Sequence, residues 1–153
     1  MTEKTLDYFQ KRIKEAQDFF AKNPEMEILE KLKIYREMAQ GIINEIQAIP
    51  EKERGYELSM IFVKACVITN NIVEALIALI DNSEGGENDP LWYYYLGHCF
   101  QCHPKKPKYD VALKNYQKFL ELATENNLKE EDRQLIGNTK SIINNLKMMI
   151  NQK

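Results

Sequence analysis

Residues 89–102, Asp-Pro-Leu-Trp-Tyr-Tyr-Tyr-Leu-Gly-His-Cys-Phe-Gln-Cys, carry the strongest indication of the fold. The Asp-Pro pair is typical of a helix start, because Asp caps free N–H groups and Pro fits the first turn. Tyr93, Leu96 and Phe100 follow at spacings of three and four residues, which places them on one face of a helix. We therefore predict a helix that begins at this pair and ends before Pro104.

The segments on both sides show the same helical period, and none has the sustained alternation of a β-strand. Asn, Pro and Gly residues separate the periodic segments and indicate where helices end and begin. The apolar run at 72–80 is broken only by Glu74 and predicts a buried helix. The sequence thus predicts an all-α fold of about seven helices, at about 6–20, 28–49, 56–68, 72–80, 90–103, 109–125 and 129–152.

A spacing pattern of aromatic, apolar and small residues runs through two of these helices: Tyr93-x-x-Leu96-Gly97-x-x-Phe100, then Ala112-x-x-x-Tyr116. It resembles the tetratricopeptide repeat, W-x2-L-G-x2-Y followed by A-x3-F. The resemblance implies an antiparallel helix hairpin in which Gly97 allows close approach and Ala112 is the small residue that faces it. This sequence has Tyr for Trp and Phe for Tyr, and no closing proline.

A weaker copy lies upstream, where Ala75-Leu76 precedes the matching Ala112-Leu113 by 37 residues, close to the usual period of about 34. One repeat cannot bury its apolar face alone, so neighbouring repeats stack. The resemblance implies a single domain over 1–153, an α-solenoid of antiparallel helix hairpins. Its predicted parts are a divergent hairpin at about 24–49, hairpins at 56–82 and 90–125, and a C-terminal capping helix at 129–152.

In the tetratricopeptide family, the first helix of each repeat lines a concave groove that binds extended peptides or partner helices. Carried over by position, the resemblance implies that three helices supply the binding residues. They are Glu57, Met60, Lys64 and Ile68; Leu91, Tyr94, His98 and Gln101; and Gln134, Asn138 and Ser141. We therefore predict a non-enzymatic adaptor that binds a protein or peptide, without a cofactor.

Two alternatives concern the partner. The run at 89–97 and the Ile-Pro-Glu-Lys-Glu-Arg segment resemble short bacterial repeat proteins, some of which serve secreted toxins as immunity proteins or chaperones. A second copy of the chain is the other alternative, because Met148, Met149 and Ile150 near the C-terminus provide apolar surface that could seal the array or pair with another chain. The expected oligomeric state is a monomer or a weak homodimer.

A further alternative is a metal- or redox-linked protein built on the segment His98-Cys99-Phe100-Gln101-Cys102-His103. Cys-x-x-Cys-His fits the attachment pattern of c-type haem, and the four His and Cys side chains are possible zinc ligands. Four ligands on one rigid helix do not surround a metal tetrahedrally. A zinc site would therefore need another ligand from elsewhere in the chain or from a partner.

The composition argues against several other classes of protein. The 21 Lys and Arg residues nearly balance the 23 Asp and Glu residues, which disfavours a nucleic-acid partner. No apolar run reaches the roughly 18 residues needed to span a bilayer, so we expect no membrane association. With two histidines, six glycines and no recognisable catalytic motif, we expect no enzymatic activity. Three cysteines without the spacing of a disulfide framework favour a cytoplasmic location.

Overall fold

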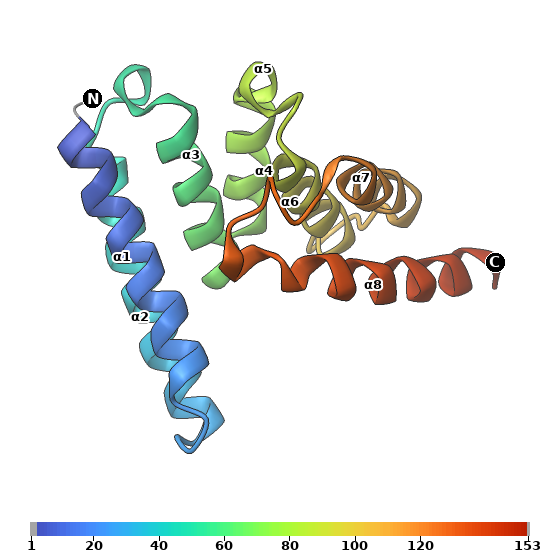
Figure 1. The fold of residues 1–153 in the computed structure, drawn as a ribbon, viewed down its shortest axis with the longest axis horizontal. Helices are drawn as coiled ribbons and strands as arrows, with labels where there is room; N and C mark the ends of the chain where they lie inside the picture. The colour runs from blue at the N-terminus through green and yellow to red at the C-terminus, as the bar shows by residue number, and fades with distance from the viewer. Residues whose placement is uncertain (1–2, 153) are drawn as a thin grey trace. The chain divides into compact units, whose positions relative to one another are not determined.

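The computed structural model describes residues 3–152, and these residues form eight α-helices and one short 3-10 helix with no β-strand (Figure 1). The all-α class predicted from the sequence is therefore confirmed. The chain divides into two compact units, Met1–Asn82 and Ser83–Lys153. The stacking of helix hairpins into one solenoid domain remains a prediction.

The first unit contains four helices: α1 (Glu3–Lys22), α2 (Ile28–Gln47), α3 (Glu51–Ile68) and α4 (Ile72–Asp81). Each helix packs against the next one, and α1 also contacts α3. One apolar stripe of α1 and of α2 faces the core, as the 3.6-residue period predicts, whereas α3 is buried on all sides over residues 58–63. The core side chains include Phe9, Ile13, Ala39, Ile42, Ile46, Leu58, Val63, Ala75 and Leu79.

The helix predicted to begin at Tyr56 is preceded by one extra turn, residues 51–54, which forms the start of α3. Gly55 separates this turn from the rest of the helix, with φ 70° and ψ 170°. A positive φ is readily adopted only by glycine, because it has no Cβ atom. The break at Gly55 therefore changes the direction of the chain at the beginning of α3.

The turn between α3 and α4 is closed by asparagines. Asn70 has φ 61°, and its N–H donates to the carbonyl of Val67 at 3.1 Å, while the N–H of Asn71 donates to the carbonyl of Cys66 at 2.7 Å. These two hydrogen bonds form a Schellman motif, which satisfies the last carbonyls of a helix. The motif ends α3 abruptly and allows α4 to begin at Ile72, two residues after Asn70.

The second unit contains α5 (Ser83–Gly86), α6 (Pro90–Gln101), α7 (Tyr109–Leu122), the 3-10 helix η1 (Glu130–Asp132) and α8 (Gln134–Asn151). The predicted cap of α6 is confirmed, because the N–H of Leu91 donates to Asp89 Oδ1 at 3.0 Å. Helices α6 and α7 pack closely, and α8 packs on α7. The buried cluster between α7 and α8 consists of Ala112, Tyr116, Ile143 and Leu146.

The close approach predicted at Gly97 is present, and the side chain nearest to a Cβ atom at this position is Tyr116. A Cβ atom at Gly97 would lie 2.9 Å from Tyr116 Cδ1. The hydroxyl of Tyr116 donates to Gln101 Oε1 at 2.7 Å. Because Gln101 is one turn beyond Gly97, the tyrosine ring lies along the surface of α6.

Candidate functional site

Helix α4 is apolar on both of its faces. Ile72, Ala75 and Leu79 are buried in the core of the first unit. On another face, Val73 is 41% exposed, Ile77 55% and Ile80 56%. We call Val73, Ile77 and Ile80 the α4 apolar face; their spacings of four and three residues bring them together on the helix.

Exposed apolar residues in this arrangement are unusual for a surface helix, which normally carries polar residues opposite its buried side. Contiguous apolar surface bordered by polar residues typically marks an interaction site. The sequence predicted a buried helix here. The structure confirms this for one face of α4, but the α4 apolar face is exposed. The signal for a site was present in the sequence, because Val73, Ile77 and Ile80 lie on a different face of this ten-residue helix from Ile72, Ala75 and Leu79.

Glu74 and Asp81 border the α4 apolar face. They are two turns apart on the same edge of the helix, and both are exposed. They are the charged residues of α4, and neither forms an ion pair with another residue in the part of the chain that the structure describes. One edge of the apolar face is therefore acidic.

A pocket of about 590 Å³ lies next to this acidic edge, entirely within the first unit. Its walls come from the end of α2, the first turns of α3 and the outer side of α4. The break at Gly55 places residues 51–54 opposite α4. The lining residues are Gln47, Glu51, Lys52, Arg54, Gly55, Ser59, Phe62, Glu74, Ile77, Ala78, Asp81 and Asn82.

Several polar groups of this pocket are already bonded within the protein. Arg54 Nε donates to the carbonyl of Ile49 at 2.9 Å, and its guanidinium carbon lies 5.8 Å from the centre of the Phe62 ring. Ser59 Oγ donates to the carbonyl of Gly55 at 2.8 Å. The Arg54 side chain is thus held against the wall of the pocket.

A second, smaller hollow in the first unit lies beside exposed apolar residues at the start of α2. Leu29, which is 70% exposed, lines it together with Lys33, Arg36 and Glu37. The charged residues around this hollow are mainly basic. It therefore provides a useful contrast with the acidic edge of α4.

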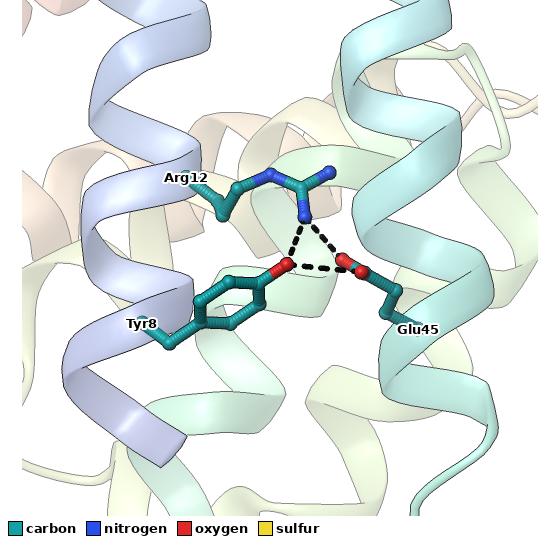
Figure 2. A network of polar contacts seen from close by, with 3 residues as sticks. All are labelled: Tyr8, Arg12 and Glu45. Carbon is teal, nitrogen blue, oxygen red and sulfur yellow. Dashed lines mark hydrogen bonds and ion pairs between the residues drawn. The ribbon is translucent and has the colours of Figure 1, made fainter. Parts of the chain in front are cut away.

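Helices α1 and α2 are joined by a polar network of Tyr8, Arg12 and Glu45 (Figure 2). Arg12 donates to both the tyrosine hydroxyl and the carboxylate, and the Tyr8 hydroxyl donates to Glu45 Oε1 at 3.0 Å. Burial works to lower the pKa of Arg12, but these hydrogen bonds and the Glu45 charge raise it overall. All three groups are bonded to one another, which fits a structural link between two helices.

The groove residues predicted on α3 lie in different environments. Glu57 is exposed, whereas Lys64 and Ile68 are half-buried. Met60 is only 7% exposed and belongs to the core. The Glu57 side chain is therefore accessible to a partner, whereas the Met60 side chain has little exposed surface.

The predicted residues of α6 take part in the packing of the second unit. The Tyr94 ring lies 5.7 Å from the ring of Tyr116 and 5.5 Å from that of Phe119, centre to centre. Burial raises the pKa of Tyr94 and lowers the pKa of His98. Leu91 is half-buried. Gln101 accepts the hydrogen bond from Tyr116 described above, so its carbonyl oxygen already has a donor.

The predicted residues of α8 are all at the surface. Gln134, Asn138 and Ser141 are exposed, and their spacings of four and three residues place them on one face of the helix. The α3 residues belong to the first unit, and those of α6 and α8 to the second. A common groove formed by all three helices remains a prediction.

The His and Cys segment forms the end of α6 and the turn that follows it. Cys99 is fully buried, and burial raises its pKa to about 12; the pKa of Cys102 is raised by the same cause. Thiols with a raised pKa stay protonated at neutral pH, whereas redox chemistry and metal binding use the thiolate. His103 Nδ1 accepts hydrogen bonds from the N–H groups of Lys105 and Lys106.

Within residues 3–152, no group of three or more His, Cys, Asp or Glu side chains is arranged to hold a metal ion. The same part of the chain contains no helix with the length and apolar character needed to span a bilayer. The exposed side chains of the α4 apolar face and the adjoining pocket make this surface the candidate site.

Comparison with known proteins adds no relative: no family model matches the sequence, and no curated protein or solved structure matches the chain. The tetratricopeptide resemblance of residues 89–125 accordingly stays a prediction from the sequence.

Proposed function

We propose that the protein is a non-enzymatic adaptor that binds another protein through the α4 apolar face. The supporting observation is the exposure of Val73, Ile77 and Ile80 on one side of a helix whose other side is in the core. Burial of one such side chain from full exposure contributes roughly 1.5–3 kcal/mol, and about half of this remains to be gained by side chains that are 41–56% exposed. Three neighbouring side chains can therefore supply the apolar centre of a protein interface.

The rigid attachment of α4 favours this role. Ala75 and Leu79 have no exposed surface, and the Schellman motif at Asn70 fixes the start of the helix. A partner can bind the apolar face without first ordering it, and such preorganisation reduces the entropic cost of association.

This proposal keeps the predicted class of function but moves the contact surface. A groove lined by the first helices of each repeat needs Met60 and Tyr94 at its surface, and both side chains pack within their own units. The narrower alternative of an immunity protein or chaperone for a secreted toxin stays a prediction.

The experiment compares wild type with the variant Ile77→Ser/Ile80→Ser. A partner is first captured from a native lysate of the source organism, purified, and titrated by calorimetry. We expect at least a tenfold loss of affinity for the variant, which corresponds to about 1.4 kcal/mol. Leu29→Ser is the matched control, because it removes an even more exposed apolar side chain from another surface of the same unit.

Equal affinity of the wild type and the double variant would overturn the proposal. Circular dichroism of each variant shows whether the helices are retained. Because both substituted side chains are more than half exposed, we expect the folded state to be preserved.

A further inference from the structure

We infer that the partner segment is amphipathic and basic: its apolar side chains cover the α4 apolar face, and one of its Lys or Arg side chains enters the adjoining pocket. This inference rests on the proposed function and specifies the chemistry of the partner. The supporting observation is the distribution of charged residues around the site. This observation does not depend on the apolar contacts.

The acidic edge of α4 favours a basic partner. Glu74 and Asp81 are exposed and lie beside Ile77 at the mouth of the pocket. No residue described in the structure neutralises either carboxylate by an ion pair. A basic segment laid along α4 meets complementary charge, whereas an acidic segment is repelled at the same place.

The opposite wall of the pocket adds a third carboxylate. Glu51 lies in the turn before Gly55 and likewise forms no ion pair among the described residues. Of the two cations in the wall, Arg54 is directed toward the Ile49 carbonyl and the Phe62 ring. Arg54 keeps its charge in these contacts, so the described lining residues carry three carboxylates against two cations.

The shape of the pocket suits a long basic side chain. Phe62, Ile77 and Ala78 offer apolar surface to its methylene stem, and the same lining includes three carboxylates for its charged group. Lys and Arg commonly bury their stems along apolar surface and keep the charged end among polar groups. One partner side chain can therefore use both components of the pocket.

The hollow beside Leu29 provides an internal comparison, because it combines exposed apolar surface with Lys33 and Arg36. If apolar exposure alone determined binding, an acidic and a basic amphipathic peptide would bind the unit equally well. Because the edge of α4 is acidic, we instead expect only the basic peptide to prefer α4.

The test uses two synthetic 14-residue peptides with the same leucine spacing, one carrying lysine and the other glutamate at every polar position. Each peptide is titrated by calorimetry into the full chain at low and at moderate salt. We expect the lysine peptide to bind at least tenfold more tightly than the glutamate peptide. We also expect its affinity to fall as salt increases, since salt screens exposed charges.

The variant Glu74→Gln/Asp81→Asn tests the acidic edge. We expect it to weaken the lysine peptide about tenfold and to remove most of the salt dependence. Glu37→Gln is the matched control, because it removes a carboxylate from the other hollow, and we expect no change in affinity. All three residues are exposed, so circular dichroism should be unaffected.

The outcomes separate this inference from the proposed function. If Ile77→Ser/Ile80→Ser weakens both peptides equally while the carboxylate variant has no effect, the basic partner is wrong and the apolar site stands. If neither α4 variant changes binding of the lysine peptide, both proposals fail at this surface. If the wild type self-associates in light scattering and the α4 apolar variant does not, a second copy is the occupant and the inference is overturned.

Discussion

The indole ring of Trp92 lies directly over Gly86, so that a Cβ atom at Gly86 would stand 2.2 Å from Trp92 Cγ. Gly86 is the last residue of α5 and is buried. Its carbonyl accepts a hydrogen bond from the N–H of Asp89 at 3.0 Å, just before α6 begins. The glycine therefore makes room for the tryptophan at the start of the second unit.

Replacement of Gly86 should disturb this contact measurably. In Gly86→Ala, the new methyl group occupies the position of the ring, and overpacking of this kind costs about 1–3 kcal/mol. Because Trp92 is the single tryptophan of the chain, its fluorescence reports the change. We expect red-shifted emission and a lower midpoint of unfolding. Gly85→Ala, at an exposed neighbour, should leave the emission unchanged; an identical shift in both variants would refute the packing role.

Two helical glycines of the second unit should respond oppositely to alanine. In Gly97→Ala, the methyl group would lie within 3.0 Å of the fully buried Tyr116 ring. The overpacking cost of about 1–3 kcal/mol should exceed the roughly 1 kcal/mol gained from helix propensity. Gly137 has no atom within 4 Å of a new Cβ, so Gly137→Ala should stabilise by up to about 1 kcal/mol. Urea unfolding followed by Trp92 fluorescence measures both; stabilisation by Gly97→Ala would contradict the close contact.

The hydrogen bond from Tyr116 to Gln101 should contribute modestly to stability. Tyr116→Phe keeps the buried ring but removes the donor at 2.7 Å, and the expected loss is about 1 kcal/mol. Gln101→Leu removes the acceptor and should have little further effect in the Tyr116→Phe background. A double-mutant cycle by urea unfolding gives the coupling between the two side chains. Strict additivity of the two substitutions would show that the bond does not contribute.

His98 should make the second unit less stable at acidic pH. Burial lowers the pKa of His98 below its ordinary value of 6.5, so the folded state keeps the imidazole neutral while the unfolded chain binds a proton. Stability from this residue is therefore present above about pH 6.5 and is lost as the pH falls toward the lowered pKa. Unfolding measured at pH 7.5 and 5.5 should show a smaller acid-induced loss for His98→Gln than for wild type. An unchanged loss in that variant would disprove the assignment to His98, and His103→Gln provides the comparison.

The helices were predictable because their signals are local. The Asp89–Pro90 start, the asparagine turn at 69–71 and the 3.6-residue period of the apolar residues each depend on a few neighbours in the sequence. Helix α5 and the turn at 51–54 were missed, because four residues are too few to show a helical period. The end of α7 falls at Leu122, three residues before the predicted end.

The candidate site was harder to predict than the helices. Burial of Met60 depends on which face of α3 meets the core, and the resemblance to a repeat assigned it to the surface. Likewise, the apolar character of Ile77 and Ile80 indicated burial, although both side chains are more than half exposed. A single sequence shows which side chains are apolar. Whether an apolar side chain is buried depends on the tertiary contacts around it.

The interruption at Gly55 also has a dynamic consequence. Since residues 51–54 form a separate turn, they can fray and re-form without breaking the main-chain hydrogen bonds of Tyr56–Ile68. Amide protons in that short turn should then exchange with deuterium sooner than those of the helix behind it. Because Glu51 lies in that turn, we expect its side of the pocket to open more readily than the side formed by α4.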